Sequence, residues 1–307
     1  MLRHLRALLG LLVPFSCILV LGGCESAVVA TPVPTTITIG GSTAMRRVLV
    51  DLTAAYNRQH PDVLFVIRGG GSTVGEELVR GREVDLGAST LFPPEQRTDG
   101  SAATPPPADD PLVRVPIGLD GLAVIVHPSN SIDGLSLVQL RDIFAGRLLD
   151  WHALGSDAGE IQLVSREDGS GSRILFETRV MGDERVALTA VVMPSSQDVV
   201  DYVAKNPQAV GYVSRAEVAE WIAEADTAAA GAAPAANGTA VPPRVKIIPV
   251  EGKLPTRATV RGQEYALTEP LYLISYGQPT GKIRQFIDFV LSPAGQAIVN
   301  RYDAPIR

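Results

Sequence analysis

From residue 36 onward, short apolar runs alternate with amphipathic stretches, and turns rich in glycine, serine and threonine separate several of them. Thr36–Ile39 is typical of a strand, and the apolar residues from Met45 to Tyr56 recur at three- and four-residue spacings, as on one helix face. Val63–Ile67 predicts a buried strand, and Val84–Ala88 predicts the next one. This order predicts βαβ units, and therefore an α/β fold with mainly parallel sheets flanked by helices.

The rest of the chain continues the same pattern. Leu122–Val126 predicts another buried strand. Ser136 and Gln139 have the spacing of a capping box, which begins a helix, and Pro293 has the place that proline favours in the first turn of a terminal helix. Further strands are predicted at Ile161–Val164, Ala209–Val213 and Leu271–Ser275.

The N-terminus has the features of an export signal. Arg3 and Arg6 precede an apolar run at residues 8–21, which is shorter than the about 20 residues that a spanning helix needs. Leu21-Gly22-Gly23-Cys24 is similar to the bacterial lipobox, which implies cleavage before Cys24 and attachment of lipid to its sulfur. An ordinary signal peptide with an incidental cysteine is the alternative. We expect an exported protein, lipid-anchored to the cell membrane and facing the periplasm or the extracellular side.

The segments around the cleavage point follow from this signal. Residues 1–23 form the predicted signal peptide, and residues 24–35, small and rich in proline, form the lipidated cysteine and its tether. Cys17 and Cys24 are the only cysteines, and Cys17 would be removed. The mature chain would therefore have no disulfide bond.

Charge and motifs exclude several classes of function. A formal net charge of −6 argues against a nucleic-acid partner, because such proteins need a basic face. A small anion stays compatible, since a few N–H groups and one arginine can hold it. No Gly-x-Ser-x-Gly motif surrounds Ser72 or Ser170, and the four histidines lack metal-ligand spacing. We expect a binding protein and not an enzyme, without cofactor or metal.

Three turns are the candidate binding elements, at residues 41–44, 70–73 and 169–172. Each is rich in glycine, serine or threonine and stands between a predicted strand and a predicted helix. The first turn of a helix leaves N–H groups unpaired, and together with the helix dipole these attract an anion. The alternative for each turn is structural, because serine and threonine are also the usual N-caps.

Arg166 is the leading candidate for a charged contact. Its planar guanidinium, at the end of a predicted strand, can form two parallel hydrogen bonds with an oxyanion. A salt bridge with Glu167 or Asp168 is the alternative, and the two interpretations are compatible. Arg173 is either a second anion contact or a surface charge.

Several longer segments carry a family resemblance. These are Arg166–Arg173 (REDGSGSR), Asp120–Pro128 (DGLAVIVHP), residues 137–151 (LVQLRDIFAGRLLDW), Val210–Val213 (VGYV) and Phe286–Gln296 (FIDFVLSPAGQ). On these motifs the chain resembles the phosphate-binding proteins of bacterial phosphate ABC importers, from about residue 36 to the C-terminus. The resemblance implies a periplasmic-binding-protein-like fold, with two hinged lobes that close on the ligand.

The resemblance also implies the domains and the partners. Lobe I would comprise residues 36–117 and 262–307, and lobe II residues 118–261. Residues 223–243, rich in alanine, glycine and proline, would be a surface insertion that lengthens a loop of lobe II. The expected partners are inorganic phosphate, the permease subunits of an ABC transporter and the membrane, through the lipid. We expect a monomer.

The family's ligand contacts transfer to positions in all three turns. The implied phosphate contacts are Ser42, Thr43, Ala44, Ser72, Thr90, Arg166, Ser170, Gly171 and Ser172, and Arg173 is a further candidate from its place on the first turn of the following helix. Asp168 is implied as the partner of Arg166. Many family members have aspartate where this chain has Thr90, to accept the proton of phosphate; a hydroxyl can accept or donate, so discrimination against sulfate should be weaker.

Two other functions stay open at this point. The chain could bind another oxyanion, such as sulfate or molybdate, or sense or scavenge phosphate without a transporter. A hydrolase is the remote alternative, and it would need a nucleophile beside a general base; no histidine lies near the three turns in the sequence.

Overall fold

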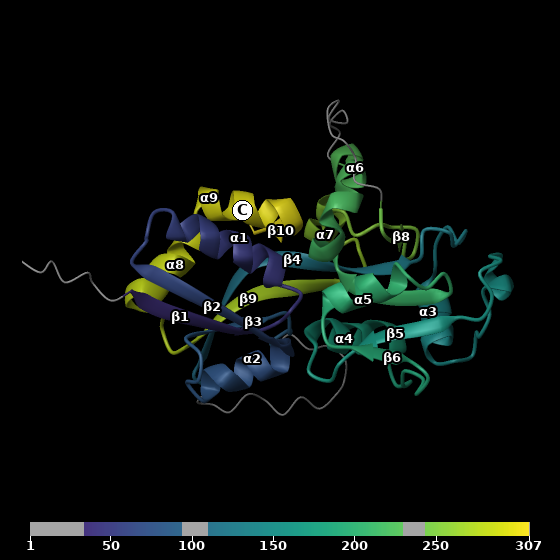
Figure 1. Cartoon of the computed structure of the whole chain (residues 1–307), viewed down its shortest axis with the longest axis horizontal. Coiled ribbons are helices and arrows are strands. Elements are labelled where there is room, and N and C mark those ends of the chain that lie inside the picture. Colours follow the sequence, from purple (N-terminus) through teal and green to yellow (C-terminus); the bar gives the residue numbers. More distant parts are fainter. Residues whose placement is uncertain (1–33, 94–109, 230–242, 307) are drawn as a thin grey trace, which may run out of the picture. The chain divides into compact units, whose positions relative to one another are not determined.

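The strands of the computed structural model form a mixed sheet with the order β2-β1-β3-β9-β4-β7-β5-β6, and β8 and β10 also pair with β4 (Figure 1). The structure describes residues 34–93, 110–229 and 243–306. The strands are β1 (Thr35–Gly41), β2 (Val63–Gly70), β3 (Leu86–Ser89), β4 (Leu112–Val126), β5 (Gln162–Arg166), β6 (Val191–Met193), β7 (Ala209–Ser214), β8 (Lys246–Ile248), β9 (Thr268–Tyr276) and β10 (Ala304–Pro305). The helices are α1 (Arg46–Asn57), α2 (Gly71–Arg80), α3 (Leu137–Phe144), α4 (Gly171–Phe176), α5 (Ser196–Val203), α6 (Ala219–Ala229), α7 (Arg257–Arg261), α8 (Gly281–Leu291) and α9 (Pro293–Tyr302).

The centre of the sheet is antiparallel, so the prediction of mainly parallel sheets was wrong there. Parallel pairs occur in two outer groups, where β1 pairs with β2 and β3, and β5 pairs with β6 and β7. Between these groups β9 runs antiparallel to β3 and β4, and β4 runs antiparallel to β7. An apolar run indicates a strand but not the direction of its neighbours. The βαβ units were therefore predictable, and the central antiparallel strands were not.

Strand β2 is one edge of the sheet, which corrects the prediction that Val63–Ile67 is a buried strand. The side chains of Leu64 and Val66 are 49% and 40% exposed, whereas Val63 is buried. The sheet order leaves β2 with β1 as its neighbour, and only one of its faces packs on the core. Its apolar composition does not show that one face stays open.

The helices cover both faces of the β2-β1-β3 group. Helices α1, α8 and α9 lie on one side of these strands and α2 lies on the other (Figure 1). Val48, Leu49 and Leu52 of α1 are buried, as their spacing predicts. The N-cap predictions are also confirmed, because Ser136 and Gln139 form a capping box at the start of α3. The first two glycine-rich turns lie at the ends of β1, which is inside the sheet, and of the edge strand β2.

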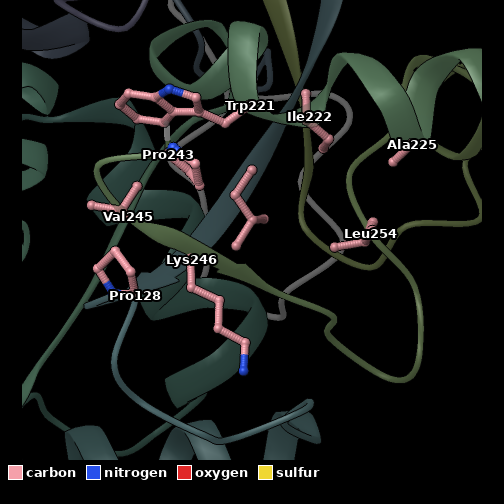
Figure 2. A pocket seen from close by; sticks show the side chains of 9 residues that line it. Pro128, Trp221, Ile222, Ala225, Pro243, Val245, Lys246 and Leu254 are labelled. Atoms are coloured by element: carbon pink, nitrogen blue, oxygen red, sulfur yellow. The ribbon is translucent and has the colours of Figure 1, made fainter. Parts of the chain in front are cut away.

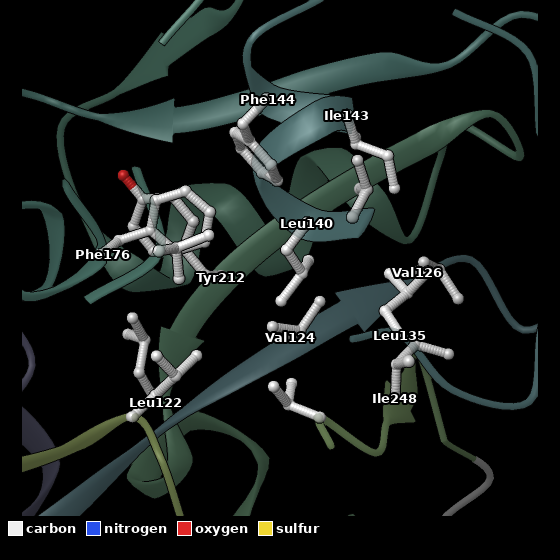
Figure 3. Packing of buried hydrophobic residues seen from close by; sticks show 14 of the residues in the cluster. Leu122, Val124, Val126, Leu135, Leu140, Ile143, Phe144, Phe176, Tyr212 and Ile248 are labelled. Atoms are coloured by element: carbon white, nitrogen blue, oxygen red, sulfur yellow. The ribbon is translucent and has the colours of Figure 1, made fainter. Parts of the chain in front are cut away.

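An aromatic pair supports the end of β5, where Arg166 lies. The rings of Phe176 and Tyr212 stack with centroids 4.2 Å apart, within the core cluster that Figure 3 shows. The Tyr212 hydroxyl lies 2.8 Å from Ser165 Oγ. The stacked Tyr212 ring thus holds Ser165, the residue directly before Arg166, through this hydrogen bond.

The region predicted as a loop-lengthening insertion begins as a helix, which corrects the start of residues 223–243. Helix α6 extends to Ala229, because alanine favours helix, and residues 230–242 lie outside the described residues. Asp226 on α6 is buried and pairs with Arg215 at 2.6 Å. The first part of this region therefore belongs to the packed structure.

The predicted export signal and Cys24 lie outside the described residues. Within the described ranges, we find no helix with the length and apolar character to cross a membrane. The signal peptide, the lipidation and the tether remain predictions.

Candidate anion-binding site

Arg166 is the last residue of β5, and its side chain is only 1% exposed. Nη2 donates to Thr43 Oγ1 at 2.9 Å and to Glu167 Oε1 at 2.8 Å. Nη1 donates to Ser196 Oγ at 3.0 Å, and Nε lies 3.1 Å from Glu167 Oε2 and 3.2 Å from the carbonyl of Met193. A buried guanidinium therefore has two hydroxyl groups among its partners, and one of these comes from the first turn.

The carboxylate partner of Arg166 is Glu167, so the assignment of Asp168 to this role was wrong. Asp168 is 95% exposed and pairs with Arg173 at 2.6 Å. Arg173 also donates to Glu177 at 2.8 Å and to the carbonyl of Arg166 at 3.0 Å. Arg173 is partly buried and pairs with residues of its own segment, and its role as a second anion contact stays a prediction.

The first turn reaches the site through Thr43. The backbone N–H of Ser42 donates to the carbonyl of Ala88 at 2.8 Å, which fixes the turn at the end of β3. Met45 occupies the N-cap position of α1, so the hydroxyls of Ser42 and Thr43 are not the caps of this helix. The structural alternative therefore does not explain them, and Thr43 contacts Arg166 instead.

The second and third turns pack directly on each other. Thr73 N donates to the carbonyl of Gly169 at 3.1 Å. A Cβ on Gly71 would lie 2.7 Å from that carbonyl oxygen, and a Cβ on Gly171 would lie 2.0 Å from Thr90 Oγ1. Only glycine allows these backbones to approach so closely.

Three hydroxyl groups gather beside Gly171. Ser72 Oγ and Thr90 Oγ1 lie 3.4 Å apart, and Thr90 N donates to Ser72 Oγ at 3.1 Å. Ser172 Oγ donates to Glu269 Oε1 at 3.1 Å. Ser170 differs from them, because its hydroxyl accepts from Arg173 N at the N-cap of α4 and is explained by that role.

Most of the predicted contacts are brought together and buried. The buried ones are Ser42, Ala44, Ser72, Thr90, Arg166, Ser170, Gly171 and Ser172. Thr43 and Arg173 are half-buried. The three turns, separate in the sequence, therefore share one location, as the expected site requires.

Glu269 is a site residue that the sequence analysis missed. It is the second residue of β9, fully buried, and it hydrogen bonds with Ser172 and with the hydroxyl of Thr90. A carboxyl residue just before the apolar run Leu271–Ser275 is the only sequence signal. That signal is weak, because such a position is equally typical of a solvated strand end.

Burial governs the electrostatics of this carboxyl group. Desolvation raises the pKa of Glu269 well above its usual value, and the nearby Asp120 raises it further; Arg166 acts in the opposite direction. Asp303 is buried beside them, and desolvation followed by the charge of Asp120 raises its pKa as well. The buried carboxyl of Glu269 thus contacts the hydroxyls of Ser172 and Thr90, and the guanidinium of Arg166 contacts the hydroxyl of Thr43.

Another pocket, next to α6 and β8, does not suit an oxyanion. Figure 2 shows this cavity of about 310 Å³, which Trp221, Ile222 and Val245 line with apolar surface. The one cation in its lining, Lys246, donates to the carbonyl of Asn130 at 3.1 Å. Among the described residues, no group of three histidine, cysteine or carboxylate side chains could hold a metal.

Comparisons with known proteins identify the family of the chain. Residues 27–294 match the PBP superfamily domain. The phosphate-binding protein PstS of Bacillus subtilis (strain 168) is 25% identical over 256 residues, which cover 83% of this chain and 75% of that protein. PstS of Borreliella burgdorferi is 21% identical over 272 residues, covering 86% of this chain and 87% of that protein.

Solved structures show the same fold. A phosphate ABC transporter substrate-binding protein from Clostridium perfringens, solved with bound phosphate, is similar with a TM-score of 0.73 and 26% identity; the match covers 89% of this chain and 100% of that one. An ABC-type phosphate transport receptor from Vibrio cholerae has a TM-score of 0.62 and 28% identity, over 88% of this chain and all of the other. The chain has an α/β periplasmic-binding-protein-like fold, belongs to the PBP superfamily and is a distant homologue of the PstS phosphate-binding proteins.

Proposed function

We propose that this protein binds inorganic phosphate with Arg166 and the hydroxyl groups around it. The observation that carries the proposal is that the buried guanidinium of Arg166 donates hydrogen bonds to the hydroxyls of Thr43 and Ser196. A hydroxyl is a weak partner for a guanidinium, and an oxyanion would replace it with charge-assisted bonds that are roughly twice as strong. The names of the PstS relatives support phosphate as the anion.

Binding requires the turns to separate and close again. Groups that are as buried as Arg166 and Ser72 cannot meet a ligand while the three turns are in contact. We propose two lobes, residues 36–117 with 262–307 and residues 118–261, which carry the first two turns and the third turn respectively. Phosphate would favour the closed state, because it contacts both sets of turns only when they converge.

The proposed role is delivery of phosphate to an importer. The predicted lipid on Cys24 would hold the protein at the outer side of the membrane, and residues 24–35 would let it reach a permease. The relatives' names, which include a substrate-binding protein of a phosphate ABC transporter, support this role. Sensing or scavenging of phosphate would use the same site without a permease.

Calorimetric titration tests the proposed ligand. The purified protein, freed of endogenous anion, is titrated with phosphate, sulfate and molybdate in parallel at neutral pH. We expect phosphate to bind with a Kd of micromolar or tighter, which is about −8 kcal/mol. Absence of phosphate binding would contradict the proposal, and preference for sulfate or molybdate would move the protein to another oxyanion.

A further inference from the structure

We propose that the ion pair of Arg47 with Glu217 holds the closed state and thereby sets how slowly the bound anion is released. The inference rests on the proposed function, since it uses the two proposed lobes and their closure. It goes beyond that function, because it assigns control of release to two positioning residues that lie outside the three turns.

The pair joins the two proposed lobes. Arg47, on the first turn of α1, belongs to lobe I, and Glu217, on the short helix Arg215–Val218 that follows β7, belongs to lobe II. Arg47 Nε lies 2.9 Å from Glu217 Oε2. The side chain of Glu217 is only 5% exposed, whereas that of Arg47 is 36% exposed. A nearly buried carboxylate of one lobe thus pairs with a partly exposed cation of the other.

Each partner is attached to one side of the anion site. Arg47 comes four positions after Thr43, and the N–H of Arg46 donates to the carbonyl of Thr43 at 3.1 Å. The segment of Glu217 continues β7, which pairs with β5, the strand that ends at Arg166. An anion enters when Thr43 parts from Arg166, and the same movement should separate the ion pair.

A gap lies beside the pair, between α1 and α5. This cavity of about 340 Å³ has Val50 of α1, Gln197 of α5 and Glu217 among its lining residues. Apolar side chains that filled the gap would attract the two elements to each other without any charge. Because the gap is not filled, the ion pair is a bridge across it, and its free energy contributes to closure.

Burial makes the closed state sensitive to the loss of Arg47. Desolvation raises the pKa of Glu217, and the charge of Arg47 acts in the opposite direction. A buried carboxylate without its cation is unfavourable, whereas the same group in an open state would be in water. Loss of Arg47 should therefore destabilise the closed state more than the open state. Because release requires opening, the anion should then leave faster.

The rate of phosphate release tests this inference. The protein is loaded with radioactive phosphate and mixed with an excess of unlabelled phosphate, and the loss of bound radioactivity is followed over time. We expect Arg47→Gln to release phosphate about tenfold faster than the unaltered protein. Arg47→Lys keeps a cation for Glu217, so its release rate should stay within about threefold of the unaltered rate.

Arg46→Gln is the matched control for the loss of charge. Arg46 is exposed on the same turn of α1, and it forms no ion pair with any residue that the structure describes. This variant removes one positive charge at nearly the same place and should keep the release rate within about twofold. The double variant Arg47→Gln with Glu217→Gln removes the unpaired carboxylate as well, so it should release phosphate more slowly than Arg47→Gln alone.

The outcomes separate this inference from the proposed function. If the unaltered protein does not bind phosphate, the proposed function fails and the inference fails with it. If the protein binds phosphate and Arg47→Gln releases it no faster than Arg46→Gln, the function stands and the inference is overturned. Urea denaturation without phosphate gives a second readout. A lower unfolding free energy in Arg47→Gln together with an unchanged release rate would overturn the inference too, because the pair would then stabilise the open and closed states equally.

Discussion

Two arginine side chains, Arg166 and Arg215, are almost completely buried, and each pairs with a carboxylate and with backbone carbonyls, but Arg166 also donates to side-chain hydroxyls. Arg215 pairs with the buried carboxylate of Asp226 at 2.6 Å and donates to the backbone carbonyls of Pro255 and Tyr302. Arg166 pairs with Glu167, whose side chain is 25% exposed, and donates to the hydroxyls of two other residues.

The difference separates a structural cation from one available to a ligand. The partners of Arg215 are a carboxylate and carbonyl groups that the fold holds in place, and an anion that replaced them would break the buried ion pair of Arg215 with Asp226. Thr43 and Ser196 can turn their hydroxyls elsewhere when an anion arrives. Burial of an arginine alone is therefore no sign of a binding site, and the chemistry of its partners is the better guide.

The largest effect is expected at Arg215. Arg215→Met leaves the buried Asp226 carboxylate with the partly exposed Arg257 as its remaining cation, and breaking such a buried pair costs up to about 3–5 kcal/mol of unfolding free energy. Urea denaturation measures this loss. The double variant Arg215→Met with Asp226→Leu should recover part of it, and an unchanged stability in the single variant would contradict the structural role.

The next effect concerns binding through Arg166. Arg166→Met removes two charge-assisted hydrogen bonds of about 1.5–3 kcal/mol each, so phosphate affinity should fall by about 100-fold or more. Arg166→Lys should restore only part, because lysine lacks the bidentate geometry. Calorimetric titration gives both values, and a loss of affinity no larger than that in Arg215→Met would erase the distinction between the two arginines.

A smaller loss is expected for single hydroxyl groups. Thr43→Val removes a single hydroxyl group and should weaken phosphate binding by about fivefold, which is about 1 kcal/mol. Ser42→Ala, in the same turn, is the matched comparison, since its hydroxyl has no assigned contact with Arg166. If either variant costs as much affinity as Arg166→Met, the guanidinium is not the central contact.

The smallest effect is on stability as a function of pH. Burial raises the pKa of Asp120 to about 6, and it also raises the pKa of Glu269 and Asp303. The folded chain then binds these protons more tightly than the unfolded chain, so stability falls as pH rises through about 6. We expect a Tm that is a few degrees higher at pH 5.5 than at pH 7.5. Asp120→Asn should flatten this dependence; a Tm that rises with pH would contradict it.

Local patterns predicted much of the fold and of the site. Glycine-rich turns and an arginine at a strand end depend on neighbouring residues, so the places of the three turns between strands and helices, and of Arg166 at the end of β5, were predicted correctly. The partner of Arg166 was not, because Glu167 and Asp168 are adjacent and their side chains point in different directions, which the sequence alone does not show. The choice between them needed the backbone geometry at the end of β5.

Long-range pairing accounts for what could not be predicted. Glu269 reaches Ser172 across 97 positions of the chain, and Arg215 reaches the carbonyl of Tyr302 across 87. Neither contact leaves a periodic or spaced pattern in the sequence. The antiparallel pairing of β4 and β9 has the same cause, since strand direction depends on the neighbour and not on the strand's own residues.

A crystal structure of the protein grown with phosphate tests the central claim most directly. We expect one phosphate beside Arg166, with its oxygens at about 2.7–2.9 Å from the guanidinium nitrogens, as in charge-assisted bonds. The hydrogen bond of Arg166 with Thr43 should be replaced or shared. A phosphate bound elsewhere, with the bonds of Arg166 to Thr43 and Ser196 unchanged, would contradict the claim.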